Sequence, residues 1–179
     1  RHGVQQVTEG QSTSSTAGFL VGLTRVVVIS AMALVGGILA AMALGAVPSS
    51  RRRLLTVQVG GLLGGVAGLL AIPLEAAYIG GLGLGAITDA DAWRSVLDTR
   101  IGVAWMVRAL VLFFGALALA ISARHHTRGW WRSSVVALLL TVGLTSAYGG
   151  HGATGRWVLV GIIATVVHVV AMAIWMLVK

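Results

Sequence analysis

Residues 146–179 read SAYGGHGATGRWVLVGIIATVVHVVAMAIWMLVK, and most of this stretch is apolar enough to lie in a membrane. It also contains two histidines. His151 lies in a Gly-rich turn where a span leaves the bilayer, and His168 lies deep in the following apolar run. An imidazole is costly to bury in lipid, so it usually has a partner or a function. We therefore expect both histidines close to any ligand that the protein handles.

The composition of the whole chain has the same character. Hydrophobic residues make up 57% and charged residues 10%, and the mean hydropathy is +0.93. A soluble domain of 179 residues cannot cover so much apolar surface with so few charges. The composition predicts an all-α fold, a polytopic transmembrane helical bundle. The formal charge of +8 does not indicate a nucleic-acid partner, because basic residues in membrane proteins mostly mark cytoplasmic loops.

The apolar residues fall into about five stretches that could each cross the lipid bilayer. A span needs roughly 20 apolar residues. The predicted transmembrane domain is 18–179, and residues 1–17 form a polar tail or linker. The predicted spans are 18–46, 54–82, 99–122, 133–149 and 156–178.

The loop charges predict the orientation of these spans. Arg51, Arg52 and Arg53 follow the first span, and a second basic loop runs from Arg124 to Arg132. These are alternate connections, so the positive-inside rule makes them cytoplasmic. The N-terminus is then expected outside, in the periplasm or the extracellular space.

A ladder of glycines occupies the first half of the second span. Its spacings repeat the small-xxx-small pattern, which lets a neighbouring helix approach closely along one stripe. Pro73 lies beyond the ladder and predicts a kink, because it removes a helix hydrogen bond. The ladder consists of Gly60, Gly61, Gly64, Gly65 and Gly68.

The polar connection at 83–98 predicts a short surface helix. Thr88 and Asp91 have the spacing of a capping box. Trp93 would then lie at the level of the lipid headgroups.

Three charged residues inside the spans fall at a similar depth. With a rise of about 1.5 Å per residue, Arg25, Glu75 and Arg108 all lie in the outer half of the membrane. This indicates an outward-facing polar vestibule, with His151 at its rim and His168 at its floor. The alternative is a structural ion pair between Glu75 and either Arg25 or Arg108.

The final span offers ligands for a soft metal ion. His168, Met172 and Met176 are spaced i, i+4, i+8 and share one helix face. Imidazole and thioether groups suit Cu(I), and the chain has no cysteine to supply a thiolate. Two alternatives stay open, since methionine commonly fills gaps in a helix core and His168 could bond a neighbouring carbonyl.

Three stretches carry a resemblance to a known family, and the first is TRVVVISAMALVGGIL in the first predicted span, which resembles the first helix of that family. DTRIGVAWMVRALVL, residues 98–112, resembles the "tR.G..WllR..ll" helix of the CopD family of copper-resistance and copper-uptake membrane proteins, which includes the membrane half of YcnJ-type fusions. GGHGATG…VVHVVAMAIW resembles the "GHA…lHl.aa.iW.GGl" segment of that family. The matching positions are Thr99, Arg100, Gly102, Trp105, Arg108, Gly150, His151, His168 and Trp175.

The resemblance implies a protein that moves copper across the inner membrane beside a periplasmic carrier of the CopC type. It implies His151 and His168 as copper ligands, while Met172 and Met176 rest on spacing alone. A homo-oligomer is a further candidate assembly. No Ser–His–acid set is recognisable, so we expect no enzyme activity. Two other functions stay open: a bundle that binds b-type haem, and a non-transporting subunit that docks a periplasmic copper carrier.

Overall fold

The computed structural model describes residues 2–80, 84–149 and 158–178, without the side chains of residues 2–15, 86, 169–170 and 172–178. Within this part every regular element is a helix, and no strand occurs. The elements are α1 (His2–Ala43), α2 (Arg51–Gly80), the 3₁₀ turn η1 (Leu84–Ile87), α3 (Ala90–Leu97), α4 (Arg100–Leu110), the π-helical turn η2 (Val111–Gly115), α5 (Ala116–Ile121), the 3₁₀ turn η3 (Ser122–His125), α6 (Gly129–Tyr148) and α7 (Val158–Val178).

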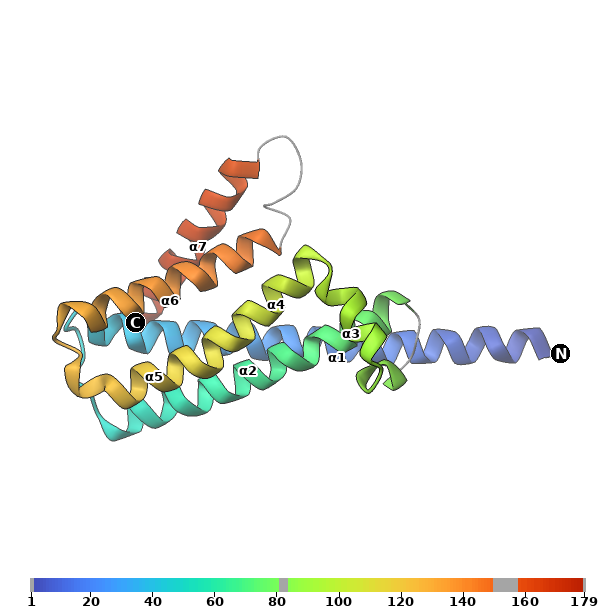
Figure 1. Ribbon diagram of the computed structural model, residues 1–179, viewed down its shortest axis with the longest axis horizontal. Coiled ribbons are helices and arrows are strands. Elements are labelled where there is room, and N and C mark those ends of the chain that lie inside the picture. Colours follow the sequence, from blue (N-terminus) through green and yellow to red (C-terminus); the bar gives the residue numbers. More distant parts are fainter. Residues whose placement is uncertain (1, 81–83, 150–157, 179) are drawn as a thin grey trace.

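Three helical segments are long and apolar enough to cross a membrane, namely Thr16–Ala43, Arg51–Gly80 and Arg100–His125. They confirm the predicted class, an all-α membrane protein. α6 and α7 correspond to the fourth and fifth predicted spans but are not among these three. The count of about five spans and the outside N-terminus stay predictions. Residues 1–17 were expected as a polar tail, and the structure continues α1 through them from His2, beyond the ends of the other helices (Figure 1).

The long helices lie side by side and alternate in direction, with α7 leaning away from α6 (Figure 1). Two apolar clusters divide the bundle lengthwise. One cluster includes Met42, Val57 and Trp131 and lies where α1 meets α2 and α5 meets α6. We call this the Trp131 end. The other cluster includes Ala77, Val96 and Trp105 and lies beside α3. We call this the Arg108 end.

The glycine ladder of α2 brings two neighbouring helices close. A Cβ atom at Gly64 would lie 2.6 Å from the Ala31 Cβ of α1. A Cβ atom at Gly61 would lie 2.6 Å from the Leu112 carbonyl oxygen of η2. The prediction of one stripe was therefore too simple. Rows at i and i+1 point about 100° apart on a helix, so the ladder serves α1 with one row and α4–η2 with the other.

α3 forms as the predicted short helix, but a different residue caps it. The Asp89 carboxylate accepts a hydrogen bond from the Asp91 backbone N–H at 2.9 Å. Thr88 instead donates its hydroxyl to the Gly85 carbonyl at 3.2 Å. The ionised side chain of Asp89 is the stronger acceptor at the positive end of the helix dipole. Trp93 is half-buried and donates its indole N–H to the Ile87 carbonyl.

Candidate functional site: a polar cavity at the Arg108 end

A cavity of about 380 Å³ opens between α1, α4 and α6 at the Arg108 end. Its lining combines two arginines with apolar groups and a hydroxyl. Ile29, Ile101 and Ala104 supply much of the apolar wall. The remaining lining residues are Arg25, Met32, Trp105, Arg108, Ser146 and Gly149.

Arg25 reaches this cavity from α1 and is held by the carboxylate of Glu75 on α2. Its Nη2 donates to Glu75 Oε1 at 2.5 Å. Glu75 is only 3% exposed, whereas the Arg25 side chain is 52% exposed. Of the two partners that the sequence left open for Glu75, the structure therefore has Arg25. A carboxylate buried this deeply needs such a partner, because an unpaired buried charge is strongly destabilising.

Arg108 enters the cavity from α4 and is 8% exposed. Its Nη2 donates to the Thr145 carbonyl of α6 at 2.9 Å. The guanidinium carbon lies 4.8 Å from the centre of the Trp105 ring, a cation–π contact that holds the group beside the indole. Nε of Arg108 is buried and has no hydrogen-bond partner among the described residues.

The charges of this cavity determine which ions it can accept. Two guanidinium groups face it and one carboxylate lies next to it, so the local balance is positive. A free metal cation would be repelled by that balance, whereas an anion would be attracted. In the described residues no group of three or more His, Cys, Asp or Glu side chains could hold a metal ion.

Comparison with known proteins decides the family. The family model for the copper resistance protein D-like N-terminal domain matches residues 15–157. This range is most of the chain. The chain belongs to this family. No curated protein and no solved structure matches the chain.

The CopD-like match includes the described helices α2 to α6 and all three charged residues of the predicted vestibule. It also reaches His151, which lies outside the described residues. This match confirms the family resemblance that the sequence showed. The match ends before His168.

Of the four predicted copper ligands, the structure describes the side chain of His168 alone. His168 is exposed on α7 and does not line the cavity. Met172 and Met176 belong to the backbone of α7, and their side chains lie outside the described residues. Their role as ligands, like that of His151, stays a prediction.

Sequence reasoning placed only two of the nine lining residues at this cavity, and three of the others carry a thioether, an indole or a hydroxyl. Met32 lies seven positions after Arg25, and therefore on the same face of α1. Trp105 lies three positions before Arg108, which is the spacing that allows the cation–π contact on one helix. Helical spacing from each buried arginine could have found both. Ser146 carries no such signal, since its place depends on how α6 packs.

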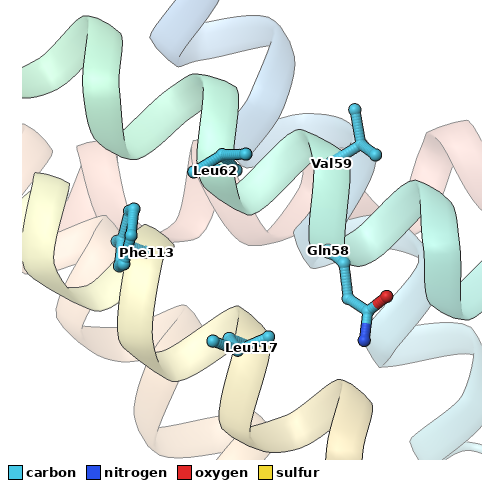
Figure 2. A pocket seen from close by; sticks show the side chains of 5 residues that line it. All are labelled: Gln58, Val59, Leu62, Phe113 and Leu117. Carbon is cyan, nitrogen blue, oxygen red and sulfur yellow. The ribbon is translucent and has the colours of Figure 1, made fainter.

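A second cavity, of about 330 Å³, opens between α2 and the η2–α5 segment (Figure 2). Val59 and Leu62 lie on the α2 side, and Phe113 and Leu117 face them from the other helix. Gln58 supplies the one amide of the lining. This groove contains no charged group and no metal ligand, so it is not the chemical centre of the described bundle.

Proposed function

We propose that this CopD-like protein takes up or passes copper ions across the inner or plasma membrane. The observation that carries the proposal is the family match over residues 15–157, combined with apolar helices of membrane-spanning length. The protein acts by binding and releasing an ion and catalyses no reaction. A periplasmic carrier of the CopC type is the proposed donor on the outer side.

Copper is the cargo in this proposal, and His151, His168, Met172 and Met176 are its proposed ligands. Imidazole nitrogen and thioether sulfur both suit Cu(I). Met32 adds a thioether in the wall of the polar cavity. Because the cavity charges repel a bare cation, copper would have to be held by these soft donors or delivered by the carrier.

A haem-binding bundle has less support. Bis-histidine haem ligation needs two imidazoles that face each other across the porphyrin at matching depth. His168 is exposed on α7, and His151, the other histidine that the sequence offers for this role, lies outside the described residues. A non-transporting docking role is also compatible with the family match. The measurement of copper accumulation below distinguishes this role from transport.

The test is copper content and copper accumulation of the full chain, with His151→Ala/His168→Ala beside the wild type. Protein purified from copper-supplemented cells is analysed by mass spectrometry, and cellular copper is measured in parallel. We expect near-stoichiometric copper in the wild type and a loss of most of it in the double variant. Accumulation should fall in the same cells.

The matched control is His125→Gln/His126→Gln, which also removes two imidazoles but lies at the Trp131 end. It should keep wild-type copper. If wild type and both variants contain no copper, copper binding by this chain is wrong. If copper is bound but accumulation never depends on the chain, the docking role replaces transport.

A further inference from the structure

Among the described residues, no carboxylate pairs with the buried guanidinium of Arg108. A guanidinium has five N–H donors and keeps its positive charge at any physiological pH. In Arg108, Nη2 donates to the Thr145 carbonyl, the guanidinium makes a cation–π contact with Trp105, and Nε has no partner among the described residues. A carbonyl dipole and an indole ring do not neutralise a full charge. A buried charge without an opposite charge costs several kcal/mol.

The carboxylates of this chain either have other partners or lie away from Arg108. Glu75 is bound to Arg25, Asp89 caps α3, and Asp91 pairs with Arg94 at 3.0 Å. The other two of the five acidic residues are Glu9 and Asp98. Asp98 is exposed and lies before the start of α4, ten positions from Arg108.

Glu9 lies in the first turns of α1, 16 positions before Arg25 and therefore about 24 Å away along the helix. No Asp or Glu follows Asp98 in the sequence. The stretch after Asp98 therefore supplies no carboxylate that could neutralise Arg108.

The space beside Arg108 can hold a small ligand. The cavity volume of about 380 Å³ lies at the small end of ligand pockets, which span roughly 300–1,000 Å³. Arg25 and Arg108 both line it, and the Ser146 hydroxyl lies in the same wall. The indole of Trp105 restrains Arg108, so less side-chain freedom is lost when the guanidinium binds a ligand.

We propose that this cavity is an anion site that binds a phosphate group, with Arg108 as the main ligand and Arg25 as the second. Guanidinium groups match the geometry of oxyanions and form charge-assisted hydrogen bonds with them. The phosphate group belongs either to free inorganic phosphate or to the headgroup of an anionic lipid. The inference goes beyond copper handling and does not depend on it.

The first arm of the test uses inorganic phosphate on the full chain purified in an uncharged detergent. Thermal unfolding is followed as sodium phosphate replaces sodium chloride at constant ionic strength, so that general screening is held fixed. The second arm uses phosphatidylglycerol. The chain is placed in phosphatidylcholine nanodiscs with increasing phosphatidylglycerol, and retained lipid is counted by native mass spectrometry. Ligand that binds only the folded state raises the unfolding midpoint.

Two variants probe the site in different ways. Arg108→Gln removes the charge, and Ser146→Leu fills the cavity while it keeps both arginines. Each should weaken phosphate-group binding at least tenfold. Arg94→Gln is the matched control, since it removes an exposed arginine whose partner Asp91 is also exposed. It should bind as the wild type does.

A saturable response to inorganic phosphate supports a soluble anion as ligand. A response to phosphatidylglycerol alone supports a lipid headgroup. The proposal is overturned if neither probe binds, or if all four proteins respond equally. Should Arg108→Gln fail to fold, the response of Ser146→Leu decides the outcome. Copper is absent from both arms, so this result is independent of the proposed transport.

Discussion

The two ends of the bundle differ in the chemistry of their buried side chains. At the Trp131 end, the indole is 0% exposed, stacks edge-on against His126 and donates its N–H to the Leu119 carbonyl at 3.2 Å. At the Arg108 end, a charged pair and a buried guanidinium surround a cavity. At the first end the buried indole has its hydrogen-bond acceptor, whereas the second places a buried donor without a partner among the described residues beside a polar cavity. This difference indicates that the Trp131 end stabilises the fold and the Arg108 end is available for a ligand.

The largest expected effect lies at the Trp131 end. Trp131→Ala removes the largest fully buried side chain and should lower the free energy of unfolding by about 3–5 kcal/mol. Unfolding in mixed micelles with rising dodecyl sulfate measures the change. Trp130→Ala is the control, because the neighbouring indole is 50% exposed and should cost less than about 1 kcal/mol. Equal losses in the two variants would contradict the assignment of this end as the packed core.

The ion pair at the Arg108 end comes next. Glu75→Gln leaves Arg25 without its carboxylate and should cost about 3 kcal/mol in the same unfolding assay, the low end for a buried pair because Arg25 is half-exposed. Arg25→Gln/Glu75→Gln should cost less than the single change, since no lone charge remains.

The exposed pair of Asp91 and Arg94 gives the reference for that prediction. Asp91→Asn removes a surface ion pair, which contributes at most about 1 kcal/mol. If Glu75→Gln costs no more than Asp91→Asn, the pair at the Arg108 end is not the buried structural contact that its burial indicates.

The third largest loss of stability is expected at the glycine ladder of α2, which lies between the two ends of the bundle. Gly61→Ala places a methyl group against the Leu112 carbonyl oxygen and the Ala116 Cβ atom, which should cost about 1–3 kcal/mol. Gly22→Ala is the control, since a Cβ atom there has no neighbour within 4 Å. Its effect should be neutral or stabilising by up to about 1 kcal/mol, because alanine favours a helix more than glycine does. A harmless Gly61→Ala would mean that α4–η2 can move away from α2 without loss.

The common level of the charged residues along the bundle could be predicted from sequence, but rotation about each helix axis could not. Apolar length located the helices, and the rise per residue placed Arg25, Glu75 and Arg108 in one layer. Whether Glu75 meets Arg25 or Arg108 depends on which way α1 and α4 turn relative to α2. That rotation follows from long-range packing, including the two rows of the glycine ladder, and no local pattern encodes it.

Local competition between neighbouring residues also limited the prediction. Thr88 and Asp89 are adjacent and both are good caps, so the sequence alone left the start of α3 uncertain by one residue. The π-helical turn at Val111–Gly115 had no sequence signal at all. This turn lies where the Leu112 carbonyl comes close to Gly61, so it depends on a contact between α2 and a segment distant in sequence.

The smallest effect is expected at Asp89, the N-cap of α3, beside the Arg108 end. Asp89→Ala removes the acceptor for the Asp91 N–H and should cost about 1 kcal/mol, confined to α3 and measured as faster hydrogen exchange of the amides of Ala92 to Val96. Thr88→Ala, the cap that the sequence favoured, should change exchange much less. Because α3 contributes Ala92 and Val96 to the apolar cluster at the Arg108 end, loosening it should raise exchange there and leave the amides around Trp131 unchanged. Equal acceleration at both ends would mean that the bundle opens as one cooperative unit, and the two ends would then differ in chemistry but not in stability.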